Sequence, residues 1–86
     1  MRMSQRRSNI EIIGDILRVS QNGTCKTKIM YNVNMSYRQI QKYLGFLMSQ
    51  GYIVKAKVGN PSVTYQPTKR GLKLLKSIDN FMEVLG

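Results

Sequence analysis

The sequence lacks histidine and tryptophan altogether and contains a single cysteine, Cys25. One cysteine cannot form a disulfide within the chain, and without histidine there is no Cys/His set for structural zinc. Acidic side chains are also scarce, because the only four are Glu11, Asp15, Asp79 and Glu83. These groups offer little to acid-base or nucleophilic catalysis, so we expect no catalytic residue, no metal and no cofactor.

Long apolar runs are absent too. No run approaches the roughly 18 residues that span a bilayer, and the first residues lack the continuous apolar stretch of a secretory signal. We therefore expect a cytoplasmic protein without a membrane partner. With 86 residues, of which 42% are apolar, the chain can build one small core but not two, which predicts a single compact domain.

Negative charge is missing from the middle of the chain. The 14 Lys and Arg residues outnumber the acids and give a formal net charge of +10, and no acidic residue occurs between Ile16 and Ile78. A surface that only has to be soluble normally carries both signs, because like charges repel one another in a small fold. The imbalance favours a polyanion such as nucleic acid as the partner. A merely soluble basic protein and a membrane-surface binder are the alternatives.

The first helix is predicted from a capping pattern. Ser8 and Glu11 have the S-x-x-E spacing of a capping box, which marks a helix N-terminus. Apolar residues then recur at helical intervals, and the turn Asn22-Gly23 stops the pattern. We expect a helix over Asn9–Ser20 with an apolar side made of Ile10, Ile12, Ile13, Ile16 and Leu17.

Two further helices are predicted in the next segment. Thr24 is a candidate cap for a short helix over Cys25–Asn32. Ser36 and Gln39 then repeat the capping box in its S-x-x-Q form and open a helix over Tyr37–Gln50. The expected buried stripe of this longer helix consists of Ile40, Tyr43, Leu44, Leu47 and Met48.

The periodicity changes from 3.6 to 2 after Gly51, which has the position of a helix C′ residue. The runs Tyr52–Val58 and Val63–Gln66 predict two strands joined by a turn, and Pro67 ends the second. Thr68 then caps a last amphipathic helix. Its apolar residues are Leu72, Leu74, Leu75, Ile78, Phe81, Met82 and Leu85.

Three helices followed by a β-hairpin form the winged helix-turn-helix arrangement, and the local sequence is similar to that family. The chain resembles small archaeal winged-helix DNA-binding proteins, including a ten-kilodalton chromatin-type group that dimerises through its last helix. The likeness covers roughly residues 8 to 78. It is carried by Ile10-Glu11-Ile12-Ile13 with Asp15-Ile16-Leu17, by the run from Tyr43 to Ile53, and by Tyr65-Gln66-Pro67-Thr68-Lys69-Arg70-Gly71.

The resemblance implies a mostly helical α+β fold in three parts. Residues 1–7 are expected to be a flexible basic arm, residues 8–67 a winged-helix domain, and residues 68–86 a C-terminal dimerisation helix. The last helix has more apolar surface than a minimal winged helix can cover, so we expect a homodimer; packing against the first helix is the alternative. The candidate dimer contacts are Leu74, Leu75, Ile78, Phe81, Met82 and Leu85.

The second helix of a helix-turn-helix enters the major groove, so Tyr37–Gln50 is the expected recognition helix. Its exposed side carries Arg38, Gln41, Lys42, Gly45 and Ser49, with Tyr37 and Gln39 at the leading end. Arg38 suits guanine, Gln41 or Gln39 suits adenine, and Lys42 suits a phosphate or guanine. Gln39 is equally well explained as a cap. Gly45 serves either a close backbone approach or packing against the hairpin.

Further DNA contacts are expected from three short segments. Lys57, Asn60 and Ser62 on the wing, which spans Lys57–Ser62, are placed to reach a minor groove or phosphates. Lys26, Thr27 and Lys28 open the second helix, with the lysines facing outward toward phosphates. Arg6 and Arg7 of the arm add backbone or minor-groove contacts.

These features together predict a double-stranded DNA-binding protein, acting as a homodimeric transcriptional regulator in the cytoplasm at the nucleoid. Besides an RNA-binding winged helix, two alternatives stay open. One is a nucleoid or chromatin protein that binds without sequence preference. The other is a winged-helix module that binds proteins, against which the unbroken positive stretch counts because such surfaces usually carry mixed charge.

Overall fold

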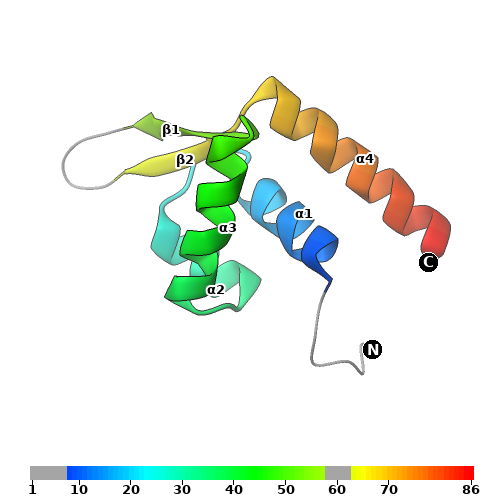
Figure 1. The fold of residues 1–86 in the computed structure, drawn as a ribbon, viewed down its shortest axis with the longest axis horizontal. Coiled ribbons are helices and arrows are strands. Elements are labelled where there is room, and N and C mark those ends of the chain that lie inside the picture. The colour runs from blue at the N-terminus through cyan, green and yellow to red at the C-terminus, as the bar shows by residue number, and fades with distance from the viewer. Residues whose placement is uncertain (1–7, 58–62) are drawn as a thin grey trace.

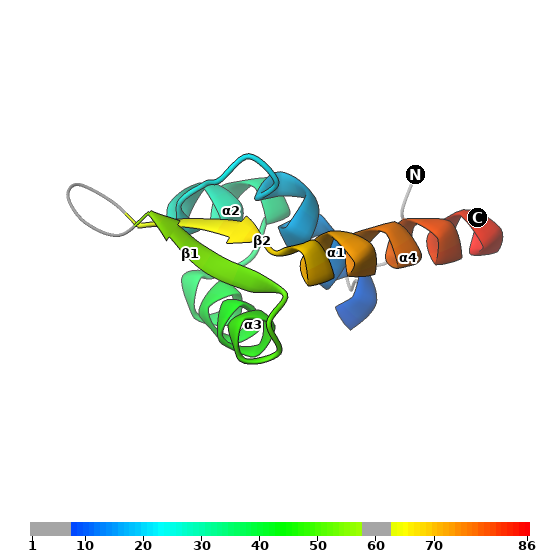
Figure 2. The same ribbon diagram turned by 90° about the horizontal axis from the view of Figure 1, so that it is seen from above.

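A computed structural model describes residues 8–57 and 63–86. The described chain folds as a helical body with a two-stranded hairpin at one end and the last helix at the other (Figures 1 and 2). The predicted order of elements and the mostly helical α+β class are confirmed. The elements are α1 (Asn9–Val19), α2 (Lys26–Val33), α3 (Tyr37–Ser49), β1 (Ile53–Lys57), β2 (Thr64–Pro67) and α4 (Lys69–Leu85).

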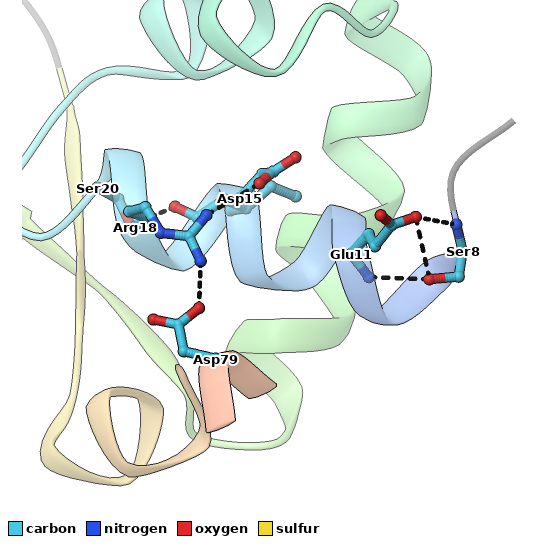
Figure 3. Close-up of polar contacts among 7 residues, drawn as sticks. Ser8, Glu11, Asp15, Arg18, Ser20 and Asp79 are labelled. Carbon is cyan, nitrogen blue, oxygen red and sulfur yellow. Dashed lines mark hydrogen bonds and ion pairs between the residues drawn. The ribbon is translucent and has the colours of Figure 1, made fainter. Parts of the chain in front are cut away.

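Both predicted capping boxes are present. The Glu11 amide donates to the Ser8 hydroxyl at 3.1 Å, and the Ser8 amide donates to the Glu11 carboxylate at 3.1 Å, as Figure 3 shows. At the start of α3 the Gln39 amide donates to the Ser36 hydroxyl at 3.1 Å, and the Gln39 side-chain oxygen accepts from the Ser36 amide at 3.2 Å. These bonds satisfy amide groups that have no partner inside the helix, and so they fix where α1 and α3 begin.

The start of α2 differs from the expectation. Cys25 is the N-cap residue, without a side-chain capping bond, and the helix begins one residue later at Lys26. Thr24 does not cap because its backbone pairs with Tyr65 on β2, through N–H···O bonds of 3.1 Å and 2.8 Å. Because the amide and the carbonyl of Thr24 are both bonded to Tyr65, its carbonyl does not accept the first bond of the helix, and α2 starts only after Cys25.

The chain leaves α3 through Gly51, as expected for a C′ residue. Gly51 has φ +79°, a conformation that is costly for residues with a Cβ atom. The amide of Tyr52 bonds the carbonyl of Leu47 at 2.8 Å, and the amide of Gly51 bonds that of Met48 at 3.1 Å. This pair of bonds is the Schellman motif, which closes the helix and turns the chain directly into β1.

The hairpin is antiparallel, and its first strand begins at Ile53, one residue later than the sequence pattern predicts, while Val58 lies outside the described residues. Ile53 pairs with Pro67 and Lys55 with Tyr65, and the register shifts between Lys55 and Lys57. Pro67 belongs to β2, whereas the sequence analysis placed it after the strand. Proline has no N–H to donate, and the end of a two-stranded ladder accommodates it without losing an interior bond.

The core lies between α1, α2, α3 and the hairpin. Its fully buried side chains come from all of these elements. They match the predicted helical stripes except that Ile13, Tyr43 and Met48 are only partly buried and Ile10 is 44% exposed. The side chains less than 2% exposed are Ile16, Leu17, Ser20, Ile29, Val33, Ile40, Leu44, Leu47 and Ile53. None of the described helices combines the length and the apolar character that crossing a bilayer would require.

The last helix packs on α1. Gly14 of α1 lies close to Ile78, since a Cβ atom added at Gly14 would be 3.1 Å from the Ile78 side chain. Arg18 forms ion pairs with Asp15 on its own helix, at 3.0 Å, and with Asp79 on α4 (Figure 3). The first turn of α4 sits so tightly on the chain after α3 that a Cβ atom at Gly71 would collide with the Tyr52 carbonyl.

Candidate nucleic-acid interface

One side of α3 is exposed and polar. Tyr37, Arg38, Gln41 and Lys42 line a shallow hollow of about 430 Å³ on this side. Ile40, Leu44 and Leu47 hold the opposite side of the helix in the core, each no more than 1% exposed. The packing therefore fixes which way α3 faces, and the side chains expected to contact base edges share its open surface.

The acidic charges of the molecule are confined to α1 and α4, and α4 also carries Lys69, Arg70, Lys73 and Lys76. Glu11 and Asp15 lie on α1, and Asp79 and Glu83 lie on α4, whereas α2 and α3 carry only positive charge. Arg18 binds two of these acids within the α1–α4 half. Arg38 and Lys42 on the exposed side of α3 have no acidic neighbour on their own helix.

Lys26 does not point freely outward as expected. Its ammonium lies over two aromatic rings, 5.1 Å from the centroid of Tyr37 and 5.9 Å from that of Tyr65. The attraction between a cation and the ring faces, with partial burial of the lysine, accounts for this position. Lys26 thereby joins the first turn of α2, the first turn of α3 and the second strand. Thr27 and Lys28, which follow it, are exposed.

Two residues of α3 have roles that the sequence left open. Gln39 uses its side-chain oxygen in the capping bond to Ser36, so its capping role is confirmed, and Gln41 is the glutamine that lines the hollow. A Cβ atom added at Gly45 would meet nothing within 4 Å. Among the described residues, nothing packs closely enough against Gly45 to require a glycine. Packing against the described part of the hairpin therefore does not explain this residue.

The remaining expected contacts are only partly described. Lys57 is the last residue of β1. Arg6 and Arg7 of the arm, and Asn60 and Ser62 of the wing, lie outside the described residues. Their roles stay predictions.

The sequence analysis named Arg70 only within the run that carries the family resemblance and gave it no contact. Its guanidinium donates to the Gln50 carbonyl at 3.0 Å and lies 4.9 Å from the centre of the Tyr52 ring. A cation at a helix C-terminus satisfies a free carbonyl and favours the negative end of the helix dipole. Arg70 thus holds the end of α3 from the first turn of α4. No local sequence signal marks this contact, because the two partners are 20 residues apart.

A second hollow, of about 580 Å³, lies between α1 and α3 and was not foreseen. Asn9, Ile13, Gln39, Lys42, Tyr43 and Phe46 line it. The Tyr43 hydroxyl donates to the Asn9 side-chain oxygen at 2.6 Å, and Phe46 is 49% exposed. Tyr43 therefore bridges the two helices at the edge of the core.

The candidate dimer residues divide into two groups. Leu75 and Ile78 are only 5% and 7% exposed, because α1 covers that side of α4. Leu74 and Met82 are partly buried. Phe81 is 50% and Leu85 65% exposed. The apolar surface left open is thus at the C-terminal end of α4, where Val84, which the sequence analysis did not include, is 83% exposed.

A three-helix core whose third helix is open along one side, followed by a hairpin and a further helix, defines a winged helix-turn-helix protein. The sequence model of the winged helix-turn-helix family matches residues 6–86, and the chain belongs to this family. It is a family of winged helix-turn-helix proteins rather than of enzymes, in agreement with the expectation drawn from the sequence.

The similar proteins are consistent with this assignment. An uncharacterised protein of Methanocaldococcus jannaschii is 36% identical over 81 residues, which cover 93% of this chain and 78% of the relative. The structure of Sso10a-2, a DNA-binding protein from Sulfolobus solfataricus, is 31% identical in sequence and has a TM-score of 0.84. The match covers 91% of this chain and 81% of that chain. The resemblance to small archaeal winged-helix proteins is confirmed.

More distant structures share the fold alone. ZitR of Lactococcus lactis, in complex with DNA, is 17% identical with a TM-score of 0.72, over 94% of this chain and 57% of that one. The protein SSV1 F-93 is 16% identical with the same TM-score, over 98% of this chain and 96% of that one.

Proposed function

We propose that the protein binds double-stranded DNA as a homodimer and regulates transcription, with Tyr37–Gln50 as the recognition helix in the major groove. The wing, Lys57–Ser62, contacts the backbone or the minor groove. The observation that carries the proposal is the open side of α3, where Tyr37, Arg38, Gln41 and Lys42 are gathered on one surface. The similarity to Sso10a-2, itself a DNA-binding protein, supports it.

The geometry of α3 fits the major groove, which is about 12 Å wide and admits one helix. Residues at the N-terminal end of a recognition helix contact base edges. Arg38 is the second residue of α3 and suits the two acceptors of guanine, while Gln41 suits adenine. Lys42, one turn after Arg38, suits a phosphate or guanine.

The other contacts fix position rather than sequence. Thr27 and Lys28 lie on α2 and Lys57 lies on β1, the elements before and after α3 in the chain, and Arg6 and Arg7 belong to the arm that precedes α1. Contacts to phosphates set affinity and register but carry no sequence information themselves. The assignment of the protein to the nucleoid within the cytoplasm follows from this proposed partner.

A nucleoid protein without sequence preference is the second candidate, and one observation favours it. The surplus of positive charge extends well beyond α3, onto α2, the hairpin and α4. Non-specific binding depends on such a widespread phosphate-binding charge. The two candidates differ in whether base contacts from α3 contribute to the binding free energy.

Selection of bound duplexes from a random library, followed by titration of variants, tests the proposal. We expect Arg38→Ala to lose preference at one base position, at a cost of about 1–3 kcal/mol for the preferred sequence only. Lys57→Ala should weaken all sequences about equally and lower the salt slope by roughly 0.9. Gln21→Ala, on the exposed α1–α2 connection, is the control and should change neither.

Two results would contradict parts of this proposal. Equal, sequence-independent losses for Arg38→Ala and Lys57→Ala would mean that the protein packages DNA without reading it. Absence of salt-dependent duplex binding by the unaltered protein would reject DNA as the partner and leave a protein-binding module.

A further inference from the structure

The last helix carries a row of lysines that the proposed function does not use. Lys69, Lys73 and Lys76 follow one another at spacings of four and three residues, which places them on one side of a helix. All three are exposed. We call these residues the α4 lysine stripe.

The stripe lies on the side of α4 opposite to α1. Gly71, Leu75 and Ile78 are the buried residues of α4, and Ile78 lies beside Gly14 of α1. At 3.6 residues per turn, the lysines project about half a turn away from this buried side. The exposed apolar residues Phe81 and Leu85, three and seven residues after Ile78, continue this buried side toward the C-terminus. The stripe therefore stays open when α4 packs on α1 and when Phe81 and Leu85 are covered.

The stripe is unfavourable for the isolated helix. Lys73 has Lys69 four residues before it and Lys76 three residues after it, and like charges at these spacings repel. Lys69 is also the first residue of α4, where the helix dipole is positive and disfavours a cation. Asp79, three residues after Lys76, is bound by Arg18. An anionic partner would relieve the repulsion within the stripe.

The dimensions of the stripe fit a phosphate lattice. Lys69 and Lys76 are about 10.5 Å apart along the helix axis, at a rise of 1.5 Å per residue. A strand of B-DNA carries one charge per roughly 3.4 Å of axis, so the stripe matches about three phosphates. Lysine ammoniums act as point charges toward phosphate without reading bases.

We propose that the α4 lysine stripe is a second contact surface for the phosphate backbone of duplex DNA, independent of sequence and separate from α3. This inference rests on the proposed function in one respect, that the partner is duplex DNA. It adds a surface on the first half of α4, the helix that leads from the hairpin to the other end of the molecule (Figures 1 and 2), on which duplex is held without a recognition helix.

The test measures duplex binding after the α3 surface has been disabled. Arg38→Ala with Lys42→Ala removes the principal cations of α3, and we expect weak, salt-dependent binding to a mixed-sequence duplex to remain. Adding Lys73→Gln and Lys76→Gln should lower the remaining salt slope by about 2, at roughly 0.9 per phosphate contact. Glutamine matches lysine in helix propensity, so α4 is expected to fold in these variants.

The matched control changes the net charge by the same amount elsewhere. Gln21→Glu with Asn22→Asp, on the exposed connection between α1 and α2, also lowers the formal charge by two. We expect this pair to leave the residual salt slope nearly unchanged. Circular dichroism of all variants checks that each is folded.

The possible outcomes distinguish the α4 contact surface from the proposed recognition helix. Equal effects of the stripe pair and the control pair would overturn the inference, because only total charge would then count. Loss of all binding in the α3 variant would overturn it as well, while leaving the proposed function intact. Unchanged binding in the α3 variant would instead reject the recognition helix, and a fall in slope specific to the stripe pair would still support the inference.

Discussion

Gly45 is placed at the centre of the open side of α3, in line with Arg38, Lys42 and Ser49. Glycine within a helix costs about 1 kcal/mol relative to alanine, and nothing in the fold needs the missing side chain, because an added Cβ atom meets open space. A close approach of the α3 backbone to DNA, which the proposed function implies, is the explanation that a substitution can test.

The substitution Gly45→Ala should separate stability from binding. We expect the free energy of unfolding to rise by up to about 1 kcal/mol, while duplex affinity falls because the methyl group holds the backbone away from the groove. Urea denaturation and gel-shift titration measure the two quantities. Unchanged or stronger DNA binding by a stabilised variant would show that α3 does not approach the duplex at this position.

Lys26 is a second residue whose surroundings decide its role. A lysine that contacts a phosphate contributes roughly 0.9 to the salt slope, whereas a lysine held over Tyr37 and Tyr65 acts by orienting the start of α3. We expect Lys26→Met, which keeps the apolar stem, to weaken binding to the preferred sequence with little change in slope. Lys26→Arg retains the cation over the rings and should restore affinity. A slope lower by about 1 in Lys26→Met would assign Lys26 to a phosphate instead.

At the scale of elements, the connections between helices determine how α3 is presented. The Schellman motif at Gly51 closes its C-terminus, Arg70 reaches the Gln50 carbonyl from α4, and the capping box at Ser36 fixes its N-terminus. Both ends of α3 are therefore held by contacts that do not occupy its open side. A recognition surface benefits from such support because less freedom is lost on binding.

Repulsion within the lysine stripe should lower the stability of α4. Replacing Lys73 and Lys76 by glutamine removes two like-charge pairs, each costing about 0.2–0.5 kcal/mol in a helix. We expect the double variant to unfold at higher urea concentration in low salt, by about 0.5–1 kcal/mol, and this gain should shrink as salt screens the repulsion. A less stable double variant would mean that the lysines make favourable contacts within the fold.

At the scale of the whole molecule, the open side of α3 and the exposed C-terminal end of α4 lie apart (Figure 1). The α2–α3 half is positive, while the four acids lie on α1 and α4 and the exposed apolar side chains Phe81, Val84 and Leu85 lie at the end of α4. Such a separation allows one end of the molecule to bind DNA while the other pairs with a second copy.

Association through this end is testable by mass measurement in solution. We expect the unaltered chain to be a dimer and Phe81→Ser with Leu85→Ser to be a monomer that stays folded, because both side chains are largely exposed in the single chain. The salt slope for a duplex that holds a whole dimer should then fall by about half, since half of the phosphate contacts are lost.

Leu72→Ser is the matched control for this pair. Leu72 is also exposed, at 43%, but lies near the other end of α4, so its substitution should leave the dimer intact. A monomeric unaltered protein, or a dimer that survives the Phe81/Leu85 substitutions, would contradict dimerisation through the end of α4.

Much of the fold was predictable because its signals are local. The capping boxes at Ser8 and Ser36 and the cap at Thr68 involve residues three apart, and the helical and strand periods extend over neighbouring turns. Such patterns are determined by bond geometry within a few residues. The candidate face of α3 followed in the same way, because the apolar residues of that helix define the side that packs inward.

The sequence by itself thus determined the order of elements, the direction in which α3 faces and the excess of positive charge. Only the tertiary structure decided that Thr24 pairs with Tyr65 instead of capping α2 and that Lys26 rests on two rings. It also decided that Leu75 and Ile78 are buried within the fold while the side chains of Phe81 and Leu85 stay exposed. These outcomes depend on how helices far apart in the chain approach one another, and that approach is determined by the joint packing of the core rather than by any local pattern.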